Sequence, residues 1–379
     1  MDNLFSQPTQ EKSCVIVVYA KPIKEEKMRN YKNLQKMLLI IAAISIAVMS
    51  CDSTKPGALV VFDIENHIQW FDIVETIKTR GNNHSYMINI INDFDLPPTV
   101  SNIYDPWNPN YTFGSARRIK IEIRGNQTIT SNKNDLSIAP RQNMTIRDVI
   151  LSGTRVSIAT NAVFSMKGNA SVRDNEGDGI RCSGRFFMFD NSTVENNEVG
   201  VSVSPEGIFE MISGKITNNQ TESLKRSFAS GVVTVGTFIM HGGIISDNFA
   251  NAGRGGTIVV NRYGNFVMKG GVIKSNTNPN NCSAIYVEPY GSFTMIGGIV
   301  YGSVESGVSE DYANISDNQR ATLFVDHDAI AMFGDGSHIL PYLDNNPDYT
   351  DHTIVGRGNP LENEISNYKQ NNTITNKMN

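Results

Sequence analysis

Basic residues are scarce in this chain, which has 33 Lys and Arg against 38 Asp and Glu in 379 residues and a formal net charge of −5. Binding to nucleic acid needs a stripe of positive charge that faces the phosphates, and the sequence contains no such stripe. Nucleic acid is therefore excluded as the main partner. The six histidines are scattered without the spacing of metal ligands, so neither a metal site nor a cofactor is predicted.

Helical periodicity is also absent between Phe164 and Ser303, where no segment repeats its apolar residues with a helical period. Long hydrophobic runs are absent as well. The run at residues 37–50, MLLIIAAISIAVMS, is too short to span a membrane comfortably. This part of the chain is therefore not predicted to contain an ordinary transmembrane helix.

The same run fits the apolar region of a signal peptide, because basic residues precede it and Cys51 follows it directly. The residues Val48-Met49-Ser50-Cys51 resemble, imperfectly, the lipobox of bacterial lipoproteins. We therefore predict that Cys51 is lipidated and becomes the mature N-terminus. An ordinary secretory signal or an uncleaved anchor is the alternative.

A cassette of Phe-x-Met, a turn containing Gly, an aliphatic residue and Asn recurs from Phe164 to Ser303. Successive copies are 22, 23, 29, 28 and 27 residues apart. Periods in this range are typical of solenoids, in which each unit covers its apolar face only with the next copy. The leading phenylalanines are Phe164, Phe186, Phe209, Phe238, Phe266 and Phe293.

Most copies also contain an apolar alternation before Phe-x-Met, and an aliphatic residue follows the turn. Residues i and i+2 of a strand share a face, so each copy supplies three short strands. This is typical of one coil of a parallel β-helix. The predicted fold is all-β: a right-handed, pectate-lyase-like parallel β-helix, its hand following from the usual chirality of parallel crossovers. The alternations are Ile180 and Cys182, Val201 and Val203, Val233 and Val235, Ile258 and Val260, and Ile285 and Val287; the aliphatic residues are Val172, Val194, Ile216, Ile245, Ile273 and Val300.

Glycine and asparagine recur at fixed places in the turns. Gly pairs such as Gly242-Gly243 indicate a positive φ or a close backbone approach. Asn tolerates left-handed backbone and hydrogen-bonds along a stack of its own kind, so the recurring Asn residues predict a structural ladder. The ladder residues are Asn175, Asn197, Asn219, Asn248 and Asn276; Tyr301-Gly302-Ser303 breaks the pattern, as expected of a terminal region.

Cys182 and Cys282 are predicted to remain unpaired. They are separated by about four coils, or about 19 Å at ~4.8 Å per coil, whereas a disulfide bridges Cα atoms up to about 7 Å apart. Cys182 occupies the place of Val203 and Val287 in other copies. We therefore interpret it as an inert thiol in the core.

The chain divides into five regions. Residues 1–50 form the signal region, in which residues 1–27 are a candidate for a misassigned start because Met28 would begin a signal of normal length. Residues 51–58 are a lipid-anchored tether, and 59–118 are an N-terminal cap region. Its segment His67 to Arg80 is predicted to be an amphipathic helix that stops at Gly81 and covers the open end of the solenoid. The β-helix occupies 119–340, and 341–379 form a C-terminal cap and polar tail.

These residues carry a family resemblance. The repeats resemble the GTFTMxGGxIxGN units of the β-helical repeat lipoproteins of treponemes. Segments outside the repeats, Ile90 to Phe94, Thr112 to Ser115 and Ile121 to Ile129, resemble that family's N-terminal region. The chain departs from the pattern at Asn169, Asp190 and Ser213, where Gly is expected. The resemblance implies a surface or periplasmic lipoprotein with a β-helix, and it implies no catalytic residues.

One local cluster has the residue types of a polysaccharide lyase or hydrolase: Arg173, Asp174, Glu176, Asp178 and Arg181. Such enzymes place carboxylates together on one face, or bind calcium beside a basic residue. The same stretch has ordinary turn composition, and the next copies offer Glu195 and Glu198 without a matching Asp pair. We therefore favour a structural role for the cluster, and no catalytic residue is assigned.

Two outward rows are candidates for binding. The residue between Phe and Met points away from the core, and Phe187, Ile239 and Val267 make part of this row apolar. The chain's own C-terminal segment or a partner would cover it. The second row is Tyr263 and Tyr290, 27 residues apart and predicted to stack on adjacent coils. Stacked tyrosines receive a sugar or a peptide, or form a simple aromatic ladder.

The leading hypothesis is an exported, monomeric protein that is lipid-anchored at the outer membrane or cell surface. Its β-helix would present a rigid face that binds or adheres to a protein or glycan, without catalysis. A carbohydrate-active lyase or hydrolase on the same scaffold is one alternative. A passive surface or antigenic coat protein is another.

Overall fold

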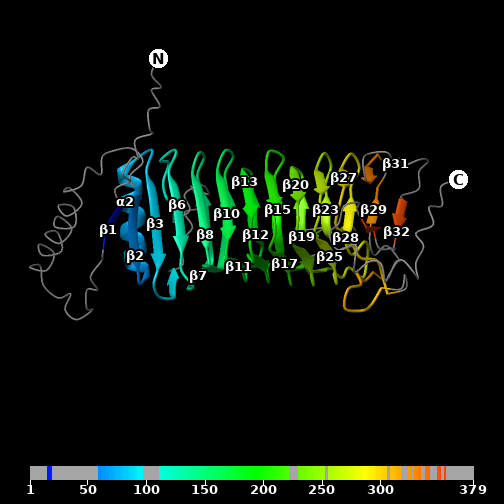
Figure 1. Ribbon diagram of the computed structural model, residues 1–379, viewed down its shortest axis with the longest axis horizontal. Helices are drawn as coiled ribbons and strands as arrows, with labels where there is room; N and C mark the ends of the chain where they lie inside the picture. The colour runs from blue at the N-terminus through cyan, green and yellow to red at the C-terminus, as the bar shows by residue number, and fades with distance from the viewer. Residues whose placement is uncertain are drawn as a thin grey trace, which may run out of the picture.

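The computed structural model describes residues 15–18, 59–96, 111–221, 229–251, 255–304, 308–316, 323–326, 328–333, 338–341, 348–350 and 354–355. Its strands are stacked along one axis, with the N-terminal coils at one end of a rod and the C-terminal coils at the other (Figure 1). The chain is a parallel β-helix, and the predicted fold class is confirmed.

The Phe-x-Met strands lie in a sheet of 13 strands, which we call the Phe sheet. Phe pairs with Phe and Met with Met between neighbouring coils. Successive Phe ring centroids are 4.6 to 5.6 Å apart, and these side chains are fully buried. In order, the strands are β1 (Val15–Val18), β2 (Leu59–Ile64), β3 (Ser85–Ile90), β6 (Lys120–Arg124), β8 (Asn143–Arg147), β10 (Val163–Lys167), β13 (Arg185–Met188), β16 (Ile208–Met211), β20 (Thr237–Met240), β24 (Asn265–Met268), β27 (Ser292–Met295), β30 (Ile330–Phe333) and β31 (His338–Pro341).

Two further ladders complete each coil, and the long strands β7 (Thr128–Ile138) and β9 (Ile150–Ile158) contribute to both. The Asn-side ladder holds the aliphatic residue after the turn: β11 (Ser171–Arg173), β14 (Thr193–Glu195), β17 (Lys215–Thr217), β21 (Ile244–Ser246), β25 (Val272–Lys274) and β28 (Ile299–Val300). The upstream ladder holds the alternation before Phe-x-Met: β12 (Asp178–Cys182), β15 (Val199–Val203), β19 (Ala229–Thr234), β23 (Gly256–Val260), β26 (Ile285–Val287) and β29 (Leu323–Val325).

One predicted register is wrong by a single residue. The upstream alternation in the Phe238 coil was expected at Val233 and Val235, but Val232 and Thr234 pair with Val201 and Val203 and are fully buried. The reason lies in the turn that follows, because Thr234 stands two residues before Gly236, as Cys182 stands before Gly184. Period-2 side chains change face with a one-residue shift, so Val233 turns outward.

The predicted helix is present as α2 (His67–Arg80). The Asn66 side chain accepts hydrogen bonds from the amides of Ile68 and Gln69 at its start, and Gly81, with φ of 81°, follows its end. Trp70 is buried, and its ring lies 6.1 Å from Phe94 and 5.8 Å from Phe113. The helix therefore packs against β2, β4 (Phe94–Leu96) and Phe113, which directly follows β5 (Tyr111–Thr112).

The Phe sheet begins before residue 119, because β2 pairs in parallel with β3, and β3 pairs in parallel with β6. Residues 59–118 thus contribute strands to the rod as well as its covering helix. In addition, β1 pairs in parallel with β2, although it lies within residues 1–27, the candidate for a misassigned start. The Val-Ile-Val-Val sequence of β1 suits a strand, since β-branched residues favour strands.

At the other end, the chain reverses direction. β31 pairs antiparallel with β30, β32 (Asp348–Thr350) with β29, and β33 (Ile354–Val355) with β28. Each of the three stacked ladders therefore ends in an antiparallel strand. These strands cover the last coil's hydrogen-bonding edge, which would otherwise be open to another chain.

The asparagine ladder is confirmed. The Asn248 amide nitrogen donates to Asn276 at 3.0 Å, and its oxygen accepts from the Asn219 side chain at 2.9 Å and from the Asn219 backbone at 3.1 Å. The left-handed φ belongs to the residue before each ladder Asn, for example 59° at Asp247. A sixth rung, Asn314, accepts from Asn276 at 3.1 Å, so the ladder continues past the break at residues 301–303.

The glycine and cysteine predictions also hold. Gly243, Gly271 and Gly298 have φ of 90° to 93°. Cys182 and Cys282 are both buried, and neither is part of a disulfide. Burial raises the pKa of the Cys182 thiol to about 12, despite hydrogen bonds with neighbouring backbone groups.

Candidate binding surfaces

Tyr263 and Tyr290 stack as predicted, with ring centroids 5.8 Å apart and planes inclined by 26°. Both lie in the turn that leads into the Phe sheet, which we call the Phe turn. Tyr263 is 70% exposed and Tyr290 47% exposed. Their φ values are 65° and 64°, which bulky side chains rarely adopt. Two large aromatic rings are thus held outward on tightly bent backbone.

Arg262 completes this group, and the sequence analysis missed it. Its guanidinium carbon lies 5.0 Å from the Tyr263 centroid and 4.6 Å from the Tyr290 centroid, within the range of cation–π contacts. The Arg262 backbone amide donates to the Glu288 carboxylate at 3.3 Å. We call Tyr263, Tyr290 and Arg262 the tyrosine platform. The signal for Arg262 was its place beside Tyr263 in the same turn.

A second pair was also missed. The rings of Tyr301 and Tyr312 stack 5.3 Å apart, and the Lys274 ammonium lies 4.3 Å from the Tyr312 ring. Tyr312 is 42% exposed. These residues do not share the spacing of the repeat, because residues 304–312 interrupt it. Sequence periodicity therefore offered no signal for this pair.

The outward row of the Phe sheet is only partly apolar. Ile239 and Val267 are paired neighbours, but Glu210 separates them from Phe187. Arg185 bonds Glu210 at 3.0 Å and lies 5.3 Å from the Phe187 ring. All three predicted apolar side chains are half-buried. Their proposed cover by the C-terminal tail lies outside the described residues.

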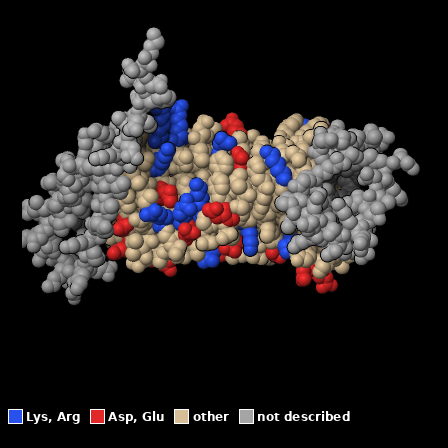
Figure 2. All heavy atoms as spheres, in the orientation of Figure 1, with Lys and Arg blue, Asp and Glu red and all other residues tan. Residues whose placement is uncertain are grey.

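The acidic cluster is largely engaged in local contacts. The Arg173 guanidinium lies 3.2 Å from Asp174, which also accepts a hydrogen bond from Ser152 at 2.7 Å. Arg181 pairs with Asp178, which accepts from Ser202 at 2.7 Å. Over the middle coils, basic and acidic side chains lie next to one another on the face shown in Figure 2. The hydrogen bonds from Ser152 and Ser202 thus fix Asp174 and Asp178 to neighbouring coils.

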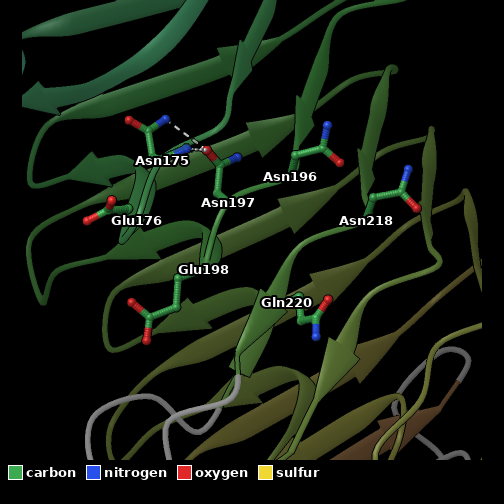
Figure 3. Close-up of a pocket in the computed structure, with 7 residues that line it drawn as sticks. All are labelled: Asn175, Glu176, Asn196, Asn197, Glu198, Asn218 and Gln220. Atoms are coloured by element: carbon green, nitrogen blue, oxygen red, sulfur yellow. Dashed lines mark hydrogen bonds between the residues drawn. The ribbon is translucent and has the colours of Figure 1, made fainter. Parts of the chain in front are cut away.

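An open hollow of about 520 Å³ lies beside this cluster (Figure 3). Glu176 and Glu198, from adjacent coils, lie along one side of it. The remaining lining residues carry amide side chains: Asn175, Asn196, Asn197, Asn218 and Gln220. Asn175 and Asn197 belong to the buried ladder and donate to their neighbours, so much of the wall is structural.

Among the described residues, no group of three or more His, Cys, Asp or Glu is placed to hold a metal ion. The same part of the chain has no helix with the length and apolar character needed to cross a membrane. Cys51, the predicted lipidation site, lies outside the described residues. Comparisons with protein-family models, curated proteins and solved structures found no match to this chain.

Proposed function

We propose that this protein is exported, lipid-anchored through Cys51 at the outer membrane or cell surface, and displays its β-helix for binding or adhesion without catalysis. The signal-like run at residues 37–50, the cysteine that follows it and the resemblance to treponemal repeat lipoproteins support the first part. The rod supports the second, because a stacked solenoid presents an extended surface of fixed shape.

The tyrosine platform is the observation that carries the binding role. Both tyrosine rings are exposed and therefore contribute little to the core. The two residues nevertheless adopt a left-handed backbone conformation, which costs on the order of 1 kcal/mol or more for each residue. Aromatic side chains on rigid backbone lose little entropy when a ligand docks. A preorganised aromatic surface of this kind is suited to a glycan or protein ligand.

The binding test is an array of glycans and matrix proteins probed with the full chain in detergent micelles. We expect at least one ligand to bind at micromolar concentration. The double variant Tyr263→Ala and Tyr290→Ala should weaken it at least tenfold, since truncation of a tyrosine that anchors an interface costs about 2 kcal/mol or more. Tyr312→Ala is the matched control and should leave the affinity unchanged. Absence of any ligand would reject the binding role and favour the passive coat protein.

Anchoring is tested separately by growing an expressing bacterium with an alkyne fatty acid. The wild-type chain should become labelled and remain with membranes, whereas Cys51→Ser should be unlabelled. Protease added to intact cells should cleave the chain if it faces outward. Equal labelling of both variants would exclude Cys51 as the modified residue.

The hollow beside Glu176 and Glu198 favours one alternative, a carbohydrate-active enzyme. Carboxylates on adjacent coils fall near the ~5–10 Å separation that glycosidases use. Turnover of polyuronides or neutral polysaccharides by the wild type, lost in Glu176→Gln and Glu198→Gln, would establish it. Turnover that survives alanine at Asp174, Glu176 and Asp178 would exclude the predicted cluster.

A further inference from the structure

The Phe turn has two lengths along the rod. Val203, Thr234 and Val260 are paired neighbours, and so are Phe209, Phe238 and Phe266. The connection from Thr234 to Phe238 is therefore two residues shorter than the connections on either side of it. We call this shortened turn, Val235 to Thr237, the step.

The step consists of the half-exposed Val235 and Thr237 on either side of Gly236, and it lacks residues that correspond to Arg262 and Tyr263. Gly236 packs against the preceding coil. A Cβ atom there would lie 2.2 Å from the Ser204 oxygen and 2.4 Å from the Gly207 oxygen. The backbone thus passes close beneath the preceding turn, and only glycine fits. The next coil stacks directly on the step, since the Asn265 amide donates a hydrogen bond to the Gly236 oxygen at 2.9 Å. The row of projecting turn residues is consequently interrupted for one coil.

Tyr263 is the first residue of the row after the step. Its amide donates to the Tyr290 oxygen at 3.2 Å, and the Tyr290 amide donates to the Asp328 oxygen at 3.0 Å. Tyr290 therefore has a projecting neighbour on both sides, whereas Tyr263 has one only on the Tyr290 side. This difference agrees with their exposures of 70% for Tyr263 and 47% for Tyr290.

Arg262 does not cover the free side of Tyr263. The ring centroids of Tyr263 and Tyr290 are 5.8 Å apart. A guanidinium on the free side of Tyr263 would therefore lie more than 5.8 Å from the Tyr290 ring. The observed distance to Tyr290 is 4.6 Å, so the guanidinium lies beside the space between the two rings. One face of Tyr263 is thus open toward the step.

The groups around this face fit a sugar ring. The partly positive C–H groups of a pyranose pack against the negative face of an aromatic ring. The exposed Glu206 lies in the long turn two coils before Tyr263. At ~4.8 Å per coil the two turns are about 10 Å apart, which leaves room for one sugar ring between them. Glu206 offers a hydroxyl acceptor and Arg262 offers donors. A proline ring would stack similarly but has no hydroxyl groups for either partner.

We propose that the open face of Tyr263 binds one pyranose ring of a neutral glycan, which occupies the step between the Glu206 turn and the tyrosine platform. The inference rests on the proposed binding function and names its ligand class. Tyr263 is the stacking residue, and Arg262 and Glu206 orient the hydroxyl groups.

The test is saturation-transfer NMR of the full chain in detergent micelles with maltotriose, cellotriose, chitotriose and mannotriose. We expect ring C–H signals from at least one trisaccharide. Tyr263→Ala should weaken binding at least tenfold, as truncation of an anchoring tyrosine does, and Tyr290→Ala by less than threefold. Equal losses in the two variants would contradict binding at the open face.

A second variant fills the step. Inserting Pro-Glu between Val235 and Gly236 copies the Ser204 to Gly207 turn and should abolish binding while leaving both tyrosines in place. The matched control is the same insertion between Ser183 and Gly184, in the other short turn, which should leave binding intact. Circular dichroism checks that both insertions fold. Should they not fold, the contrast between the two tyrosine variants decides the proposal.

The outcomes separate this inference from the broader function. Binding that survives the insertion at the step, or an array that yields only proline-rich peptides or matrix proteins, overturns the pyranose site but leaves a binding protein. Failure to bind any glycan or protein overturns both.

Discussion

The buried asparagines are the most demanding single residues in the rod. Asn248 is 1% exposed and makes five side-chain hydrogen bonds with two neighbouring rungs and two backbone carbonyls. Buried amides are tolerated only when their groups are paired, and here each rung satisfies the next. A change at one rung therefore leaves unpaired groups on its neighbours.

We predict that Asn248→Ala lowers the free energy of unfolding by about 3–5 kcal/mol, because it leaves the Asn219 amide and two carbonyls unpaired. Urea unfolding followed by circular dichroism measures this. Asn265→Ala is the control, since Asn265 is half-exposed and its side chain accepts a single bond from Ser292. Similar losses in both variants would show that the ladder is not specially stabilising.

Cys182 predicts a pH dependence. Burial raises its pKa from 9.0 to about 12, so the unfolded chain loses the proton first. The contribution of Cys182 to the free energy of unfolding is complete below pH 9 and is lost between pH 9 and about 12, by about 4 kcal/mol at the upper end. Cys182→Val, which matches Val203, removes this dependence. Unfolding curves of the two proteins should diverge only above pH 9; parallel curves would contradict the assignment.

At the scale of the element, glycine allows successive turns to lie close to one another. Gly236 and Gly184 both pass within 2.4 Å, measured from a hypothetical Cβ, of carbonyl oxygens in the preceding coil. Gly177, by contrast, has no atom within 4 Å of that position. The sequence does not distinguish these two kinds of glycine, because they differ only in the atoms that surround them in the folded chain.

We predict that Gly236→Ala destabilises the fold by about 3 kcal/mol, because the new methyl group overlaps backbone that cannot move independently. Gly177→Ala should change stability by no more than about 0.5 kcal/mol. Thermal and urea unfolding of both variants provide the comparison. A small effect at Gly236 would mean that the preceding turn yields easily.

The corrected register of β19 supplies another prediction. Thr234 is fully buried, and its hydroxyl has no hydrogen-bond partner, whereas valine fills the equivalent place in the neighbouring coils. Thr234→Val should therefore stabilise the protein by about 1–2 kcal/mol. The reciprocal change, Val235→Thr, falls on a half-exposed residue and should be nearly neutral. If Thr234→Val does not stabilise the protein and Val235→Thr destabilises it, the register predicted from the sequence would be the correct one.

At the scale of the whole molecule, one hydrophobic cluster runs without interruption from Val60 to Ala331. Coils depend on their neighbours for burial, so the ends of the stack are its weak points. The structure closes one end with α2 and the other with three antiparallel strands.

We predict that Trp70→Ala lowers stability by about 3–5 kcal/mol, because it removes the largest side chain between α2 and the first coils. It should also promote aggregation by loosening the packing of α2 on β2 and β4. Light scattering during heating measures the second effect. Ile68→Ala, at an exposed position of the same helix, is the control. Equal behaviour of the two variants would reject the capping role.

The sequence alone determined the repeat, its three strands, the buried Phe, Met and Asn stacks, and the helix at the start, because each depends on local periodicity and on residue type. It also found the tyrosine pair, since identical places in consecutive coils must lie together. The tertiary structure alone decided the register at Thr234, the position of Arg262, the sixth rung at Asn314 and the step at Gly236. These four features depend on the length of a turn and on contacts between coils. Turn lengths and such contacts do not alter the pattern of apolar residues from which the fold was predicted.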